Sequence, residues 1–303
     1  MRSMALSSIR KNVFQALMVV ASLSVVGEVN AQSPRDVTIN DTMVMPESVT
    51  SSKDGSIFFG STSKGNIYRA TPGAAKADVW IQASATGLTN VLGVLADDKA
   101  GILWVCANPA GGRGTPASGQ TALRAFDLMS GAPKGNWPFP DGGLCNDIAI
   151  APDGTAYATD TNGRRVLRLK PGGEVLDVWV SDPQLNGIDG IAILNGAVYV
   201  NLFFSGKLFR SAIQPDGTAG PITEIETSMP FTRPDGLRTT PSSKLLQAEG
   251  GGRLTEITIN DKRGEVRVLG EGFTGATAVT QIGETAFVLV ERLRVVAVPL
   301  AGR

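Results

Sequence analysis

The stretch NDIAIAPDGTAYATDT, residues 146–161, has an apolar run, a Pro-Asp-Gly turn and a second run containing Tyr157. β-Branched and aromatic residues on both sides of turn chemistry predict a β-hairpin. Five other stretches repeat this design with their own turn residues. They span residues 47–62, 93–108, 189–203, 235–250 and 276–291. Several are followed by a further strand-like run, as in RRVLRLKPGG at 164–173.

The spacing of these copies, roughly 40–55 residues, is typical of the blades of a β-propeller. After residue 31 we find no long run with the 3.6-residue period of a helix. A pair of β-sandwiches or a β-helix would not repeat a hairpin plus a third strand six times. We therefore predict an all-β fold, a six-bladed β-propeller with four-stranded antiparallel blades around a central channel, over residues 42–303.

The first 31 residues have the pattern of a secretory signal peptide. Arg2, Arg10 and Lys11 precede the apolar run VFQALMVVASLSVVG, and the small residues before Gln32 suit cleavage after Ala31. We expect a polar segment at 32–41 before the propeller. The mature protein is then expected in the periplasm or outside the cell, with no stable membrane anchor after signal removal.

Absent residue types exclude several kinds of chemistry. The 303 residues include no His and two Cys, which rules out a Ser-His-Asp triad and any His-ligated metal site. The 28 basic and 28 acidic residues balance, so no charge footprint for nucleic acid is present. The expected partner is a small molecule, and the remaining chemistry must use carboxylates, amides, hydroxyls, Lys, Arg or an oxygen-bound metal.

Four polar residues share one position relative to the hairpin turns. Glu47 lies eight residues before Gly55 in the turn of its own hairpin. Asn146 and Asp235 lie eight residues before the corresponding turn residues of theirs, Gly154 and Ser243. Asp189 lies seven residues before its turn, which is one residue shorter. The Pro-Asp-Gly triplet at Asp235 is therefore predicted to open an inner strand, although the same triplet forms the turn of the 146–161 hairpin.

First residues of inner strands meet at one mouth of a propeller channel, so these four side chains are expected to share a space. Crowded carboxylates raise one another's pKa unless a cation offsets their charge. Oxygen donors suit a hard divalent cation, Ca²⁺ first, with Mg²⁺, Mn²⁺ or Zn²⁺ as alternatives. An acidic residue at the start of a strand can also be only a loop cap. Asn186 precedes the same register and competes with Asp189 for the metal role.

These residues resemble the regucalcin (senescence marker protein)/gluconolactonase family of six-bladed propellers over about residues 42–300. The resemblance is carried by PESV at 46–49, CNDIAIAPDGTAYATD at 145–160, NGIDGIAI at 186–193 and RPDGL at 233–237. It implies an axial divalent metal, commonly Ca²⁺, with Glu47 and Asp235 as ligands. It also implies that Asn146 contacts substrate and that Asp235 is the base that activates water against a lactone. In the fourth copy the motif spelling favours Asn186, whereas register favours Asp189.

One departure concerns substrate binding. Many lactonases of that family have an Arg two residues before the Asn146 position, where this chain has Leu144. Arg113, in the Gly/Pro-rich loop of the second copy, is a candidate for that role or an ordinary solvated Arg. Phe203 and Phe204 are expected near the mouth, where they would favour an apolar substrate.

We therefore predict an exported, metal-dependent hydrolase of lactones or esters. The alternative is a non-catalytic periplasmic binding or scaffold module with a structural cation, and a strictosidine synthase-like relative is a third class. Cys106 and Cys145 are expected near the same face of neighbouring blades, either as a disulfide or as two buried thiols.

Overall fold

The computed structural model describes residues 35–110 and 119–300, so the predicted signal peptide at 1–31 lies outside the described residues. Regular structure there is almost entirely β. The exceptions are one helical turn, α1 (Ala83–Thr86), and one 3₁₀ turn, η1 (Pro183–Leu185). No helix within the described ranges is long and apolar enough to cross a bilayer.

Strand pairing divides the sheet into six antiparallel units, here called blades 1 to 6, each numbered from its innermost strand outward. Blade 1 consists of β2 (Val49–Ser51), β3 (Ile57–Phe59), β4 (Ile67–Ala70) and β5 (Lys76–Ile81). Blade 2 consists of β6 (Asn90–Asp97), β7 (Ile102–Asn108), β8 (Ala122–Asp127) and β9 (Pro133–Pro138). Blade 3 consists of β10 (Cys145–Ile150), β11 (Ala156–Asp160), β12 (Arg165–Leu169) and β13 (Asp177–Ser181). Blade 4 consists of β14 (Ile188–Leu194), β15 (Ala197–Leu202), β16 (Lys207–Ala212) and β17 (Thr223–Thr227). Blade 5 consists of β18 (Pro234–Thr239), β19 (Leu245–Glu249), β20 (Arg253–Asn260) and β21 (Arg263–Glu271). Blade 6 consists of β22 (Ala278–Ile282), β23 (Thr285–Val290) and β24 (Arg294–Pro299), with β1 (Val37–Ile39) as its outermost strand.

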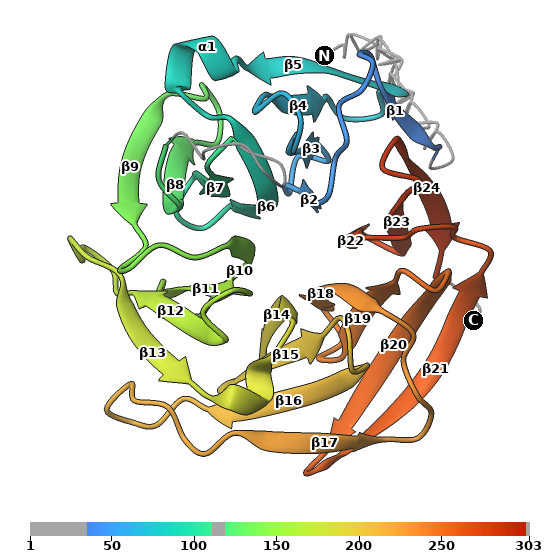
Figure 1. Cartoon of the computed structure of the whole chain (residues 1–303). Helices are drawn as coiled ribbons and strands as arrows, with labels where there is room; N and C mark the ends of the chain where they lie inside the picture. Colours follow the sequence, from blue (N-terminus) through green and yellow to red (C-terminus); the bar gives the residue numbers. More distant parts are fainter. Residues whose placement is uncertain (1–34, 111–118, 301–303) are drawn as a thin grey trace, which may run out of the picture. The chain divides into compact units, whose positions relative to one another are not determined.

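The innermost strands form a closed ring (Figure 1). Each of β2, β6, β10, β14, β18 and β22 contacts the next, and β22 contacts β2. Corresponding stretches of neighbouring inner strands lie side by side, as the close approach of Gly190 to Asp235 and of Gly236 to Ala278 shows. The strands therefore start at one end of the channel, here called the entry mouth, and finish at the other, here called the far mouth. The predicted all-β propeller is confirmed.

The N-terminal strand differs from expectation. The segment 32–41 was expected to be a polar lead-in, yet β1 lies within it and completes blade 6. Val37 pairs with Val295 of β24, and Thr38 pairs with Lys76 of β5 in blade 1. The strand is too short for its alternation of apolar and polar residues to stand out in sequence, and it is defined by pairing on both sides.

The apolar core lies between the faces of adjacent blades. Trp104 of blade 2 belongs to the same buried cluster as Ile148 and Leu167 of blade 3, and the other clusters are built similarly. Burying these facing side chains supplies the main driving force for packing the blades. A firm ring of blades in turn fixes the positions of the strand ends at both mouths.

Candidate metal centre

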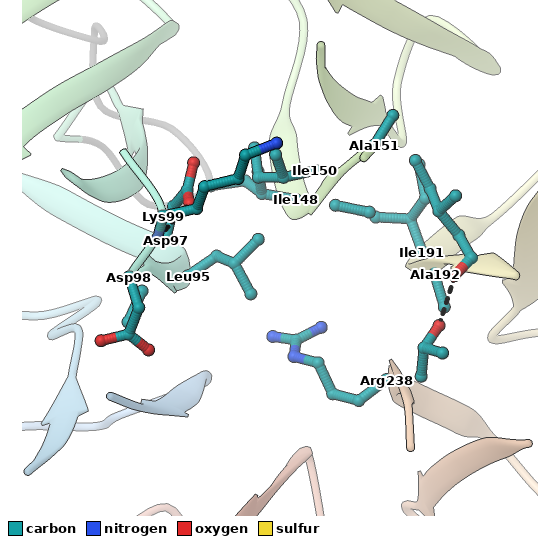
Figure 2. A pocket seen from close by; sticks show the side chains of 14 residues that line it. Leu95, Asp97, Asp98, Lys99, Ile148, Ile150, Ala151, Ile191, Ala192 and Arg238 are labelled. Carbon is teal, nitrogen blue, oxygen red and sulfur yellow. Dashed lines mark hydrogen bonds between the residues drawn. The ribbon is translucent and has the colours of Figure 1, made fainter. Parts of the chain in front are cut away.

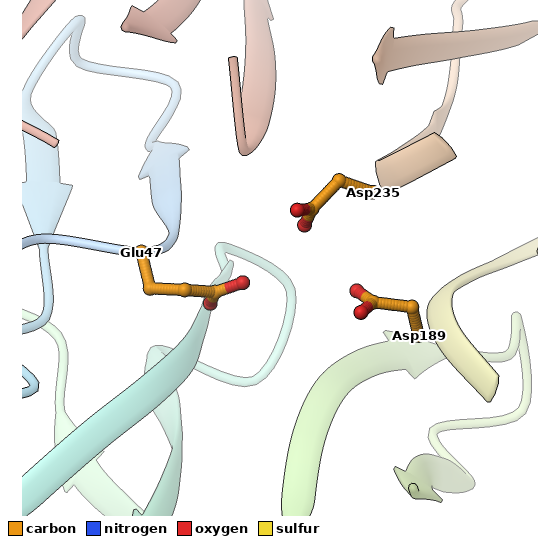
Figure 3. Close-up of side chains that lie close together, drawn as sticks. All are labelled: Glu47, Asp189 and Asp235. Carbon is orange, nitrogen blue, oxygen red and sulfur yellow. The ribbon is translucent and has the colours of Figure 1, made fainter. Parts of the chain in front are cut away.

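Three carboxylates from three blades converge at the entry mouth (Figure 3). Glu47 precedes β2, Asp189 is in β14 and Asp235 is in β18, and one oxygen of each lies within 4.8 Å of the others. All three side chains are more than nine-tenths buried. With Asn146 of β10 they line a space of about 10 Å³, which matches a single water or ion.

A β-bulge is present at three of these positions. In β18, Pro234 pairs with Glu249 and Leu237 with Gln247, which leaves one extra residue at Asp235-Gly236. The same irregularity occurs in β10 across 146–147 and in β14 across 189–190. Bulges bend a strand locally and re-aim a side chain. The shared bulge accounts for the way Asp189 and Asp235 both face the axis.

The glycine after each aspartate has a packing role rather than a turn role. A Cβ on Gly190 would lie 2.2 Å from the carbonyl oxygen of Asp235, and a Cβ on Gly236 would lie 2.7 Å from the Cα of Ala278. Neither glycine has a positive φ, whereas Gly154 in the true Pro-Asp-Gly turn has φ 91°. Gly236 therefore lets neighbouring inner strands approach closely, while Gly154 makes a turn.

Burial and mutual repulsion raise the pKa of all three carboxyls. Burial, followed by the charges of Asp189 and Asp147, raises the pKa of Glu47 to about 8. Burial and then Asp147 raise the pKa of Asp189 to about 7. The pKa of Asp235 lies well above its usual range because of burial and its two carboxylate neighbours. Such a group favours a cation, and its oxygen donors suit Ca²⁺ or Mg²⁺ better than a soft metal.

Asn201 of β15 holds the backbone of two candidate ligands. Its side-chain oxygen accepts from Gly190 N–H at 2.8 Å, and its Nδ2 donates to the Asp235 carbonyl at 2.6 Å and to Gln247 at 3.1 Å. Asn201 is completely buried. Partners of this kind orient the groups that face a metal, so Asn201 links the bulges of blades 4 and 5.

Asn146 and two threonines tie blade 3 to blade 4. Asn146 Nδ2 donates to Thr161 Oγ1 at 3.0 Å, and that hydroxyl donates to the Ile188 carbonyl at 2.7 Å. Thr159 Oγ1 donates to the Asp189 carbonyl at 2.7 Å. Burial is the main cause of the raised pKa of Asp189. A hydrogen bond between Asn146 and the Asp189 carboxyl lowers that pKa by a smaller amount. Its amide is therefore held at the edge of the carboxylate cluster.

Asp147 and Arg238 form a buried ion pair beneath the cluster that sequence reasoning missed. Arg238 Nη1 donates to Asp147 Oδ2 at 2.7 Å. Asp147 directly follows Asn146, and an alternating strand would have pointed the two side chains to opposite faces. The bulge at 146–147 changes that alternation, and nothing in the local sequence reveals it.

Arg292 is a second residue that sequence reasoning missed. It lies in the β23–β24 turn at the entry mouth, where Glu291 and Arg292 have φ of 55° and 49°. Non-glycine residues in this region are strained, and such strain concentrates at functional sites. The exposed Arg292 side chain has no ion-pair partner among the described residues. Burial raises the pKa of Glu47 and Asp189, and the positive charge of Arg292 lowers both by a smaller amount.

The remaining sequence candidates have different outcomes. Asn186 is exposed at the end of η1 and does not line the space between the carboxylates, whereas Asp189 does. Arg113 lies outside the described residues. Cys106 and Cys145 form a disulfide between β7 and β10, with Cα atoms 5.1 Å apart, so the open choice between a disulfide and two thiols is resolved. It anchors the strand start next to Asn146.

Neither a protein-family model nor a curated protein sequence matches the chain. Solved structures do match it. A gluconolactonase from Xanthomonas campestris is similar with a TM-score of 0.63 and 17% identity, over 83% of this chain and 86% of that one. A virginiamycin B lyase from Staphylococcus aureus is similar with a TM-score of 0.62 and 15% identity, over 88% and 98%.

A PQQ-bound aldose sugar dehydrogenase from Streptomyces coelicolor also matches, with a TM-score of 0.61 and 13% identity, over 88% of this chain and 96% of that one. These neighbours have different activities. At such low sequence identity, the structural similarity establishes the fold of this chain but not its activity. The resemblance seen in the sequence is supported at this level, and the chain has the fold of a gluconolactonase-like β-propeller.

Proposed function

We propose that this protein hydrolyses a lactone or a related ester at a divalent cation held by Glu47, Asp189 and Asp235. The observation that carries the proposal is the trio of buried carboxylates with oxygens within 4.8 Å of one another. Three buried acids without a paired base would be costly if their only role were structural. Ca²⁺ is the first candidate because every available donor is an oxygen.

A divalent cation in this position supplies a Lewis acid that polarises a carbonyl and lowers the pKa of water. The chain supplies the rest. Glu47 and Asp189 provide negative charge, and the Asn146 amide at their edge is placed to donate to a substrate oxygen. Arg292 at the mouth adds a positive charge where an oxyanion or a product carboxylate would form.

Asp235 is the candidate general base for the attacking water. It lies between Glu47 and Asp189, and both neighbours raise its pKa after burial. A raised pKa makes a carboxylate a better proton acceptor near neutral pH. Binding a cation lowers that pKa again, so the base role depends on how Asp235 divides between the ion and the water. Asp235→Asn separates the two roles, because retention of full kcat with metal bound would exclude Asp235 as the base.

The entry mouth favours an apolar substrate over a sugar lactone. Leu144 occupies the position at which many lactonases of the family that this sequence resembles have a sugar-binding Arg. Phe203 and Phe204 form an edge-to-face pair in the β15–β16 turn, with ring centroids 5.4 Å apart. The Phe204 side chain is 77% exposed, so it is free to contact an apolar substrate that enters this mouth.

Export belongs to the same proposal. The first 31 residues carry the signal-peptide pattern described above, and the Cys106–Cys145 disulfide suits an oxidising compartment such as the periplasm. Mass spectrometry of the N-terminus of the exported protein tests this directly. A mature chain that begins at Gln32 supports export, and a cytoplasmic chain that retains Met1 contradicts it.

Proton release during lactone ring-opening tests the proposed activity. The protein is offered sugar lactones and alkyl-substituted γ- and δ-lactones, first with Ca²⁺ and then with chelator. We expect turnover of the alkyl lactones that chelator abolishes and that Asp235→Ala lacks. Asp153→Asn, in the Pro-Asp-Gly turn of blade 3, is the matched control and keeps wild-type turnover. Cation binding without turnover on any lactone would favour the non-catalytic binding module instead.

A further inference from the structure

The far mouth of the channel contains a cavity of about 350 Å³ (Figure 2), and Arg238 lines both this cavity and the small space between the carboxylates at the entry mouth. The last residues of the inner strands of blades 2, 3 and 4 form its walls. Its larger apolar side chains with exposed surface are those of Leu95, Ile150 and Ile193, whereas Ile148 and Ile191 are fully buried in the core behind them. Its volume lies at the small end of the range for small-molecule sites.

Arg238 of β18 forms the floor of this cavity and places a cation among the apolar walls (Figure 2). Nη1 is occupied, since it donates to Asp147 Oδ2 at 2.7 Å and to the Leu237 carbonyl at 2.8 Å. Nε and Nη2 are buried and have no hydrogen-bond partner among the described residues. Buried donors without an acceptor are unfavourable. Both atoms have less than 1 Å² of accessible surface, so an acceptor that draws this edge of the guanidinium toward the cavity is stabilised.

Other charges at the cavity are already engaged at its rim. Lys99 Nζ donates to the Pro152 carbonyl at 2.8 Å. Asp97 Oδ1 accepts from the backbone N–H groups of Lys99 and Ala100, and the Asp98 carboxylate accepts from the backbone N–H of Lys53. Lys99 keeps further N–H donors, but it is exposed to solvent at the rim, so Arg238 is the charged group of the cavity whose unpaired donors are buried.

We propose that this cavity binds a small aliphatic carboxylate. Nε and Nη2 lie on one edge of the guanidinium, and that edge matches the two oxygens of a carboxylate. The leucine and isoleucine side chains would bury the aliphatic part of the ligand. An inorganic anion would leave the walls unused, and a neutral apolar molecule would leave the donors unpaired. The inference does not rest on the proposed hydrolase activity: Arg238 also lines the space between the carboxylates, but binding of a carboxylate in the cavity needs neither a cation nor turnover.

Calorimetric titration with hexanoate tests the site, with hexanamide as the neutral probe of the same shape. We expect hexanoate to bind with one site per chain and roughly tenfold or more tighter than hexanamide, as for a charge-assisted hydrogen bond. Arg238→Lys keeps a positive charge for Asp147 but lacks the two-donor edge. This variant is expected to lose roughly tenfold in hexanoate affinity and little in hexanamide affinity.

Arg165→Lys is the matched control, because Arg165 is about as buried as Arg238 and pairs with buried Asp160 elsewhere in the fold. It should leave hexanoate affinity unchanged. A crystal structure with hexanoate covers the case in which Arg238→Lys fails to fold, and it should place the carboxylate on Arg238. No binding of hexanoate, equal binding of both probes, or hexanoate bound elsewhere would overturn the proposal.

Discussion

Asp235→Asn replaces one acid of the carboxylate cluster by a neutral amide and tests what it costs the fold to bury this cluster at high pH. Without a cation, the pKa of Glu47 is about 8 against an ordinary 4.5, and that of Asp189 is about 7 against 3.8. Both folded-state values lie above the unfolded ones. The corresponding stability is therefore fully present below about pH 4, is lost progressively as the pH rises from there, and is gone once the pH has passed the folded-state values of about 7 and about 8.

The expected effect is large enough to measure. For Glu47 alone the rise in pKa corresponds to roughly 4–5 kcal/mol of stability lost by pH 8.5, at ~1.4 kcal/mol per pKa unit. Two unit charges within 4.8 Å of each other repel by roughly 3 kcal/mol at an effective dielectric constant of ~20. Burial and this repulsion keep Asp235 protonated in the fold at a pH where the unfolded chain has released that proton, and Asn needs no such proton. We therefore expect cation-free Asp235→Asn to be about 3 kcal/mol more stable than wild type at pH 8.5 and similar to it at pH 4.

Urea unfolding from pH 4 to 8.5 in the presence of chelator measures this difference. Asp153→Asn should follow the wild-type fall, because Asp153 lies in a surface turn. Adding Ca²⁺ at pH 8.5 should restore wild type and have little effect on Asp235→Asn. A wild-type stability that does not fall with pH, or a variant that falls as steeply, would refute the reasoning.

Three further perturbations have defined outcomes. Arg238→Met leaves Asp147 as an unpaired buried charge and should lower the free energy of unfolding in urea by about 3 kcal/mol. A second substitution, Asp147→Asn, should largely restore that stability. If it does not, the loss comes from packing rather than from charge. Gly236→Ala forces a Cβ against blade 6 and should destabilise by about 1–3 kcal/mol, so a wild-type thermal midpoint would contradict the close approach. Replacing Cys106 and Cys145 together by Ser should cost about 2–4 kcal/mol, and a variant insensitive to this change would show that the disulfide does not constrain blades 2 and 3.

Much of the fold is predictable from the chain because its signal is repeated. A single hairpin such as 146–161 is ambiguous, but six hairpins with a common spacing favour a propeller. The same repetition predicts that Glu47, Asn146, Asp189 and Asp235 occupy equivalent positions in their blades. β1 was not foreseen, because three residues in a polar segment carry too little pattern and their strand exists through pairing with β5 and β24.

The parts of the site that depend on local backbone irregularity were not predictable. The bulge at 146–147 brings Asp147 beneath the cluster, and Arg238 then completes a buried pair that links residues 91 positions apart. Arg292 lies in a turn without the Gly or Asn that left-handed residues usually require, so its sequence gives no turn signal. The ambiguity between Asn186 and Asp189 required three-dimensional placement, since motif spelling favours Asn186 and register favours Asp189.

The most direct test of the metal centre is anomalous diffraction from crystals grown with Mn²⁺, which accepts the same oxygen donors as Ca²⁺ and scatters anomalously. The account predicts one strong peak on the channel axis, bounded by the carboxylates of Glu47, Asp189 and Asp235. Crystals that show no peak there, or a peak held by other residues, would contradict it.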